Sequence, residues 1–171
     1  MPAAYYSFRS RSIYLAAFAL LVLTALFPVA SRAAGREIYP APEQGSADLA
    51  AAIKAARAQH KRLIIDFGVN WCGDCQVLDI YFHDPINKQL LDGNYLLVDI
   101  NIGRQDRNLE IAERYGVDVR TGVPALVVLD EHGRLLYSQR NGEFKSMRHM
   151  DISSVTSFLL QWKPASTHPG L

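Results

Sequence analysis

Two cysteines are the residues of this sequence whose spacing indicates chemistry. They are Cys72 and Cys75, the chain has no others, and Gly73 and Asp74 separate them. A structural disulfide stabilises a protein more when it closes a long loop, so a pair this close gains little in that way. A thiolate attacks disulfides, and a second thiol nearby resolves the mixed disulfide that forms. The spacing therefore predicts a reactive dithiol.

The residues around the pair predict that Cys72 begins a helix. Residues 63–67 form a short apolar run rich in β-branched side chains, typical of a buried strand, and a helix is expected over residues 72–81. Unpaired N–H groups and the helix dipole favour a negative charge at a helix N-terminus. We therefore expect a lowered pKa for Cys72, the nucleophile, and a more buried position for Cys75, the resolving thiol.

Two aspartates are candidates for proton transfer to and from these thiols. Asp66 lies within the apolar run, where a buried carboxylate is costly unless it has a partner or a role. Asp79 follows Cys72 by seven residues and Cys75 by four, which places it on the same helical face. Carboxylates at such positions accept and return protons. The alternatives are a carboxylate merely hydrogen-bonded in the strand and a solvated helix residue.

Asp74 bears on the direction of the chemistry. Its negative charge lies between the two cysteines and is expected to raise their pKa values relative to a neutral pair of intervening residues. A less stabilised thiolate gives a less oxidising couple. Asp74 therefore favours a reductase over an oxidase.

The remaining pattern predicts an α/β domain that positions the motif. The order of elements is α-β-α-α-β-α-β-β-α, which implies a central mixed sheet with helices on both faces and an antiparallel hairpin at one edge. Ser46, Asp84, Asp106 and Asp151 are the expected helix caps. Helices are expected at 46–60, 72–81, 84–91, 106–115 and 151–162, and strands at 63–67, 95–100, 125–129 and 134–138.

The N-terminus is typical of an export signal. Two arginines precede an uncharged run over residues 13–30, and small residues follow it, so residues 1–33 are expected to be a signal peptide or, alternatively, an uncleaved membrane anchor. Residues 34–45 are expected to be a flexible lead, residues 46–163 the domain, and residues 164–171 a disordered tail.

The charge balance argues against nucleic acid as a partner. The formal net charge is +1, and the chain after residue 33 carries 15 basic and 17 acidic groups. No basic stripe interleaved with aromatic residues is visible.

The stretch from Ile65 to Cys75 resembles the thioredoxin superfamily, with its strand, buried aspartate, tryptophan and Cys-x-x-Cys motif, and residues 122–125 resemble the segment that holds the family's cis-proline. The resemblance covers about residues 46–162. It implies that Cys72 is the nucleophile, Cys75 the resolving thiol and Asp66 the buried proton acceptor. It also implies a substrate-binding surface formed by Trp71, Gly73, Asp74, Val123 and Pro124.

Within that superfamily the chain is similar to the periplasmic C-terminal domain of the transmembrane reductase DsbD, through residues 81–85 and the acid at Asp79. That likeness implies a periplasmic, monomeric thiol–disulfide reductase with exported proteins as substrates and a membrane thiol reductase as electron donor. It implies no metal and no cofactor besides the redox-active Cys72–Cys75 disulfide. Two positions depart from the family: Asp74 replaces the usual proline, and Gly68 replaces a bulky aromatic residue, which is expected to leave less bulk around the site.

Other functions stay open at this point. Without an electron donor, the same motif would act as a disulfide oxidase or isomerase. A copper-binding carrier is a further alternative, because thiolates are soft ligands and Met147, His149 and Met150 cluster in the chain. Packing and loop positions are the plainer interpretation of those three residues.

Overall fold

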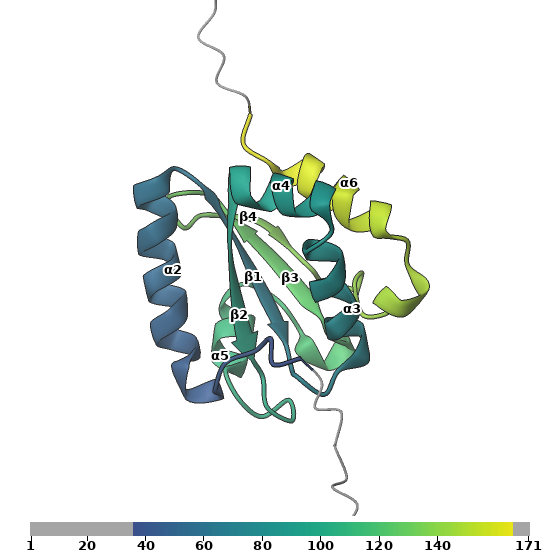
Figure 1. Ribbon diagram of the computed structural model, residues 1–171. Coiled ribbons are helices and arrows are strands. Elements are labelled where there is room, and N and C mark those ends of the chain that lie inside the picture. The colour runs from purple at the N-terminus through teal and green to yellow at the C-terminus, as the bar shows by residue number, and fades with distance from the viewer. Residues whose placement is uncertain (1–35, 166–171) are drawn as a thin grey trace, which may run out of the picture. The chain divides into compact units, whose positions relative to one another are not determined.

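The computed structural model describes residues 36–165, which form a four-stranded sheet with helices on both faces (Figure 1). The expected signal segment and residues 166–171 of the expected tail lie outside the described residues. None of the helices within 36–165 combines the length and apolar character that a membrane span requires. The elements in chain order are η1 (Pro42–Gln44), α2 (Gly45–Gln59), β1 (Arg62–Gly68), α3 (Gly73–Phe82), α4 (Pro85–Asn94), β2 (Tyr95–Asn101), α5 (Leu109–Arg114), η2 (Val119–Thr121), β3 (Ala125–Leu129), β4 (Leu135–Ser138), η3 (Met147–His149) and α6 (Ile152–Trp162).

Strand β1 occupies an inner position of the sheet and leads into the cysteine motif. The strands lie in the order β2-β1-β3-β4, with β2 parallel to β1, β3 antiparallel to β1, and β4 antiparallel to β3. Both inner strands are buried at nearly every position, because helices cover the sheet on both faces. The mixed α/β sheet that the sequence predicts is confirmed.

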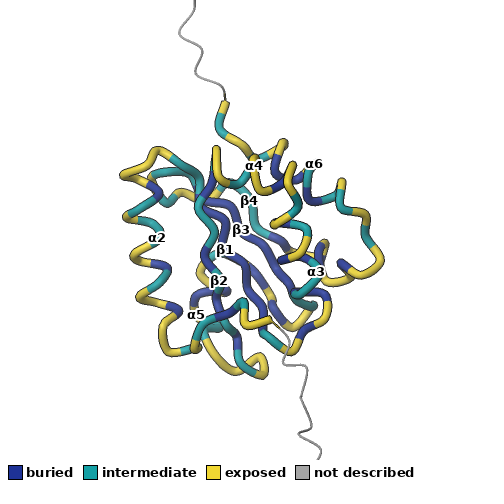
Figure 2. Tube along the Cα trace, viewed as in Figure 1, coloured by how far each residue is buried: buried dark blue, intermediate teal, exposed yellow. Residues whose placement is uncertain are grey.

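The helices divide into two layers, one on each face of the sheet. Helices α2 and α5 cover one face, while α3, α4 and α6 cover the other (Figure 1). Side chains of β1 alternate between the two layers, and the strands are the most buried part of the fold (Figure 2). One core contains Leu49, Ala56, Ile65, Phe67 and Ile111, and the other contains Ile64, Leu78, Phe82, Val155 and Phe158.

The helix caps follow the sequence in two cases out of the four. Asp84 and Asp151 each accept a hydrogen bond from the backbone N–H two residues later, as predicted for N-caps. Ser46 does not cap α2. The short helix η1 continues directly into α2, which therefore begins at Gly45 with Gln44 before it.

The helix expected over residues 106–115 is shorter than predicted. Asp106 accepts a hydrogen bond from the N–H of Arg104 and so belongs to a turn, while α5 begins at Leu109. Asn108 has a left-handed backbone (φ 53°), and its side chain donates to carbonyl oxygens of two other segments. These ties to the rest of the fold exclude a continuous helix before Leu109.

The segment expected to be a flexible lead is instead packed against the domain. Residues 36–44, called the strap below, run beside the end of β1, and Tyr39 in the strap is only 3% exposed. Asn70 accepts hydrogen bonds from the N–H groups of Ile38 and Tyr39 and donates one to the Tyr39 carbonyl, each at 2.8 Å. The flexible-lead prediction is wrong for these residues because a polar side chain of the motif loop satisfies the strap's backbone.

Candidate active site

Cys72 is the N-cap residue of α3, as the sequence predicts. Its backbone is extended, and its sulfur accepts a hydrogen bond from the backbone N–H of Cys75 at 3.2 Å. A hydrogen bond from the Cys75 thiol, helped by the N–H groups of Cys75 and Asp74, lowers the pKa of Cys72 to about 7, although burial opposes the shift. Cys72 keeps 9% of its surface exposed. This sulfur is therefore both reachable and easy to ionise near neutral pH.

Cys75 has the opposite environment. It is fully buried, and both cysteines are free thiols. The hydrogen bond to Cys72, burial and the charge of Asp66 all raise the pKa of Cys75. The pair thus consists of one thiol poised to ionise and one held protonated behind it.

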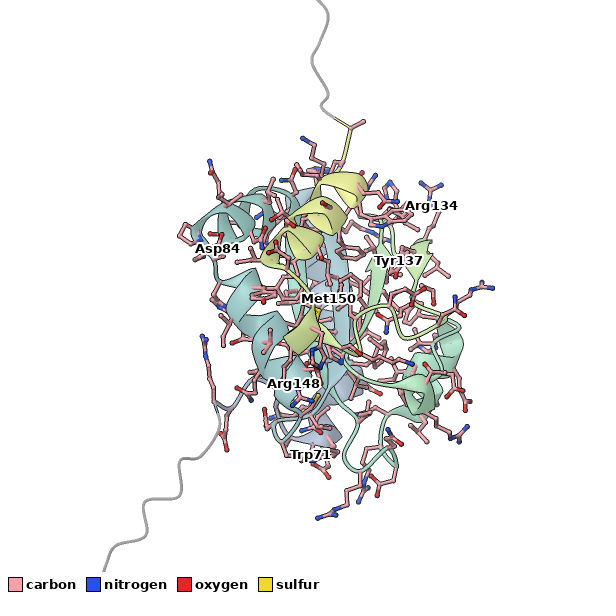
Figure 3. All side chains as sticks on the ribbon, turned by 90° about the vertical axis from the view of Figure 1, so that its right-hand side faces the viewer. Trp71, Asp84, Arg134, Tyr137, Arg148 and Met150 are labelled. Carbon is pink, nitrogen blue, oxygen red and sulfur yellow. The ribbon has the colours of Figure 1, made fainter. Side chains whose placement is uncertain are left out.

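The loop before β3 lies against Cys72. The Val123–Pro124 peptide bond is cis, as the family resemblance implies. The thiol of Cys72 donates to the carbonyl oxygen of Val123 at 3.7 Å. Gln139, which the sequence analysis did not single out, is buried and donates to the Pro124 carbonyl at 3.1 Å. The side chain of Trp71 is 71% exposed and lies at the edge of the fold (Figure 3).

Asp66 is buried beside the dithiol and bound by the strap. The hydroxyl of Tyr39 donates to its Oδ2 atom at 2.7 Å, and among the described residues its Oδ1 atom has no hydrogen-bond partner. Burial, together with the charge of Asp99, raises the pKa of Asp66 well above its usual value, and the Tyr39 hydrogen bond opposes that shift. Asp66 therefore binds a proton more readily than an ordinary carboxylate does, in the same buried region as Cys75.

Tyr39 also explains why Gly68 departs from the family pattern. A Cβ atom at Gly68 would overlap the hydroxyl and ring of Tyr39 and would lie 2.9 Å from the Cys75 sulfur. The expectation that Gly68 leaves less bulk around the site is therefore wrong. The strap supplies an aromatic side chain from outside the strand, and its hydroxyl lies next to both Asp66 and the resolving sulfur.

Asp79 lies on the buried face of α3, but charged partners hold it. Its Oδ2 atom is 2.8 Å from Arg36 Nη1 in the strap, and its Oδ1 atom is 3.2 Å from the ring of His83. Its charge acts on two other carboxyl groups, those of Asp66 and Asp99. Asp79 is therefore not a solvated helix residue, because Arg36 and His83 hold it on the buried face of α3.

Asp99 is a further, partly buried carboxyl group near Asp66, which the sequence analysis missed. It lies directly opposite Asp66 in the parallel pairing of β1 and β2. Burial and the charge of Asp79 raise its pKa to about 7, against the effect of His83. An aspartate within a second predicted buried strand was the available signal. Pairing the two strands in register would have found it.

Asp74 is held by Arg148, a second residue that the sequence analysis did not single out. The backbone N–H of Arg148 donates to Asp74 Oδ1 at 2.9 Å, and its Nε and Nη2 atoms donate to Oδ2 at 3.2 and 3.0 Å. Asp74 does raise the pKa of Cys72, as expected, but this influence is smaller than the hydrogen bonds that lower it. The expected direction of the Asp74 effect is therefore confirmed, and the pKa of Cys72 as a whole is lowered, as its place at the helix start predicts.

Comparison with known proteins decides the family. A family model described as thioredoxin-like matches residues 43–131, just over half of the chain, and these residues include both cysteines and Pro124. The chain belongs to this thioredoxin-like family. A solved structure described as a disulphide isomerase from Xylella fastidiosa Temecula1 is 30% identical, with a TM-score of 0.70, and the match covers 74% of this chain and 96% of that one.

Two curated relatives of this thioredoxin-like protein are named thiol:disulfide interchange protein DsbD. The one from Pseudomonas fluorescens is 25% identical over 137 residues, and the one from Colwellia psychrerythraea is 26% identical over 146 residues. The matches cover 79% and 82% of this chain but 21% and 24% of the relatives. The chain therefore spans about a fifth to a quarter of their length.

The methionines considered as copper ligands pack into the core of this thioredoxin-like protein. Met147 is fully buried among the side chains of the α3, α4 and α6 layer, and Met150 packs against that layer. Among residues 36–165, no group of three or more His, Cys, Asp or Glu side chains is arranged to hold a metal ion. Residues 147–150 do approach the dithiol, as the copper alternative requires, but the side chain that contacts the motif is that of Arg148, which binds Asp74.

Proposed function

We propose that this thioredoxin-like protein is an exported disulfide reductase that transfers electrons from its dithiol to the disulfides of exported proteins. The observation that carries the proposal is the asymmetry of the pair at the start of α3. Cys72 keeps an exposed edge and has a pKa of about 7, while Cys75 lies fully buried behind it with a raised pKa. A thioredoxin nucleophile has a pKa near 7, whereas that of the strong oxidant DsbA is near 3.5. The pKa of Cys72 thus favours a reductant.

The reaction is a two-step exchange. The Cys72 thiolate attacks one sulfur of the substrate disulfide, which forms a mixed disulfide and releases the first substrate sulfur as a thiolate that takes up a proton. Cys75 then loses its proton to the Asp66 carboxylate and attacks the Cys72 sulfur. The second substrate sulfur leaves and is protonated, and the protein keeps a Cys72–Cys75 disulfide. Two electrons have moved from the dithiol to the substrate, and no other cofactor takes part.

Asp66 is suited to the proton transfer because its raised pKa lets the carboxylate bind the proton of Cys75 and later release it. Asp79 contributes by its charge on Asp66. Both roles are part of the proposal.

The substrate docks around Cys72 in this proposal. Trp71 offers an exposed aromatic surface beside the sulfur, and Gly73 and Asp74 form the turn that presents it. The backbone of Val123 and Pro124 would pair with an extended substrate segment in the manner of an added strand.

The electron donor we propose is a membrane thiol reductase in the periplasm. Two observations support this: relatives named DsbD, and an N-terminal sequence typical of an export signal. The donor would reduce the Cys72–Cys75 disulfide by the same exchange in reverse.

Disulfide isomerisation is a second candidate, because the Xylella fastidiosa structure described as an isomerase is 30% identical and is covered over 96% of its length. An isomerase works through the same nucleophile but rearranges the substrate's bonds without net reduction. Refolding of a scrambled disulfide protein without an added reductant separates this activity from reduction.

The proposal is tested by trapping and by the reduction potential. Cys75→Ser should accumulate mixed disulfides with substrate proteins, whereas Cys72→Ser should form none and lose insulin reduction. The potential of the Cys72–Cys75 couple should lie near −270 mV, the value of thioredoxin. A potential near −120 mV, as in DsbA, would contradict a reductase. Full activity of Cys72→Ser would contradict the mechanism.

A further inference from the structure

Arg148 forms the most extensive side-chain contact with the residues between the two cysteines. Its guanidinium and backbone N–H engage both carboxylate oxygens of Asp74, at 2.9 to 3.2 Å. It belongs to η3, which is 74 residues away along the chain and packs against α3. The two side chains differ in exposure: Asp74 keeps 12% of its side-chain surface, while Arg148 keeps 63%. A buried carboxylate of the motif is thus covered by an arginine at the surface.

The guanidinium also lies over the turn that presents Cys72. A Cβ atom at Gly73 would be 3.6 Å from the Cδ and Nε atoms of Arg148, so the arginine passes directly across this turn. Arg148 and the Trp71 side chain lie at the same end of the fold (Figure 3). The hydrogen bonds and charge of Asp74 raise the pKa of Arg148, and the charge of Cys72 adds a smaller effect in the same direction.

Asp74 and the Cys72 thiolate compete for the same positive helix end. Asp74 is in the first turn of α3 and Cys72 is its N-cap, so both negative groups belong to the positive end of the helix. Without compensation, a carboxylate at this position opposes the thiolate. Burial by itself would raise the pKa of Asp74, but the hydrogen bonds from Arg148 outweigh burial and keep it below its usual value. Asp74 is therefore charged whenever Cys72 ionises, and its charge has to be balanced.

We propose that Arg148 is a positioning residue of the dithiol, which balances the charge of Asp74 and thereby keeps the Cys72 thiolate accessible beside a carboxylate. The inference rests on Cys72 being the nucleophile of the proposed function. His149 is a weaker contributor, since its charge also acts on Asp74. Asp66 and Cys75 also interact with Cys72, and the hydrogen bonds of the Arg148 side chain go to Asp74 and to neither of them.

The test is the pH dependence of Cys72 alkylation in four proteins: the parent, Arg148→Ala, Asp74→Asn and the double variant. Cys72 modification is followed by iodoacetamide labelling and mass spectrometry. Arg148→Ala should raise the pKa of Cys72 and slow alkylation at pH 7 by roughly three- to ten-fold. Asp74→Asn should not slow it. In the Asp74→Asn background, loss of Arg148 should have a clearly smaller effect. Arg148→Lys should restore part of the rate, because lysine keeps the charge but not the planar fork.

A matched control is available in the same chain. Arg134 pairs with Asp130 through its Nε atom and its backbone N–H, as Arg148 pairs with Asp74, but it lies far from Trp71 and Arg148 (Figure 3). Arg134→Ala should leave the alkylation profile unchanged, whatever it does to stability. A purely structural role for Arg148 would alter the unfolding transition without moving this profile.

Two outcomes would overturn the inference. One is an Arg148→Ala profile that coincides with those of the parent and Arg134→Ala. The other is an equal loss of rate with and without Asp74, since Arg148 would then act on the thiolate directly. Both outcomes are measured by the alkylation of Cys72 with iodoacetamide, which needs no protein substrate. Failure of the proposed function would appear separately: the parent protein would not reduce insulin, while the effect of Arg148→Ala on Cys72 alkylation would persist.

Discussion

Gly68, the last residue of β1, is the position where one methyl group tests the packing of the strap against the dithiol. A Cβ atom there would overlap the Tyr39 hydroxyl and ring. The ring can respond in two ways. A shift within its site costs about 1–3 kcal/mol, the usual cost of overpacking a core. Expulsion of the strap costs more, because about 1.5–3 kcal/mol of aromatic burial is lost together with a hydrogen bond to a carboxyl group worth about 1.5–3 kcal/mol.

The response of Tyr39 that costs less free energy determines how far Gly68→Ala destabilises the protein. We expect Gly68→Ala to lower the free energy of unfolding by about 2 kcal/mol, with Tyr39 shifted but still packed. At a urea dependence of about 1–3 kcal/mol per M, that loss moves the midpoint of unfolding down by about 1 M. Urea titration of the reduced protein, followed by the fluorescence of Trp71 and Trp162, measures it.

The same substitution elsewhere is the control. Gly93 lies in α4, and a Cβ atom there would meet nothing within 4 Å. Gly93→Ala should stabilise the protein by about 0.5–1 kcal/mol, because alanine loses less backbone entropy in a helix. In a Tyr39→Ala background, Gly68→Ala should lose most of its effect, since the group it displaces is gone. Two results would contradict this packing argument. One is an equal change in the free energy of unfolding for Gly68→Ala and Gly93→Ala. The other is a Gly68→Ala destabilisation that is unchanged in the Tyr39→Ala background.

Three further predictions concern charge, docking and proton transfer. Folded Asp99 keeps its proton up to about pH 7, whereas an unfolded aspartate loses it near pH 4, so this carboxyl lowers stability as the pH rises between those values. Asp99→Asn should remove that dependence and be more stable at pH 8 by on the order of 2 kcal/mol, measured by urea unfolding at pH 5 and pH 8; an unchanged pH dependence would contradict the assignment. Trp71→Ala should raise KM for a protein disulfide several-fold and leave the reaction with a small aromatic disulfide unchanged in stopped-flow assays; equal loss with both would contradict docking. Asp66→Asn should slow release of the mixed disulfide roughly 10²-fold or more, seen by rapid quenching, while the first attack by Cys72 persists.

The sequence was sufficient for those parts of the site that are carried by local pattern. The apolar run before the motif, with its β-branched residues, predicts β1, and a strand followed by Cys-x-x-Cys places Cys72 at a helix start. The aspartate in the apolar run predicts a buried carboxyl, and Asp66 is 3% exposed. Each of these inferences depends on residues within about ten positions of one another, where spacing along the chain determines position in space.

The parts that the sequence did not reveal depend on long-range contacts. Tyr39 reaches Asp66 across 27 residues, and Arg148 reaches Asp74 across 74. A proline-rich stretch is typical of a loose lead, and contacts with distant residues, such as those of the Asn70 and Asp66 side chains, show why this one is fixed. Likewise, an arginine beside two methionines gives no sign of its partner until η3 packs against α3. In both cases a polar side chain satisfies a group that local pattern leaves unpaired.

The most direct test of the account is the pH at which each cysteine of the reduced protein becomes reactive. Alkylation from pH 5 to pH 10, with the modified residue identified by mass spectrometry, measures it. We expect a midpoint near pH 7 at Cys72, with Cys75 unmodified in the folded protein throughout. A midpoint near 8.5, the value of an ordinary thiol, or equal modification of the two cysteines would contradict it.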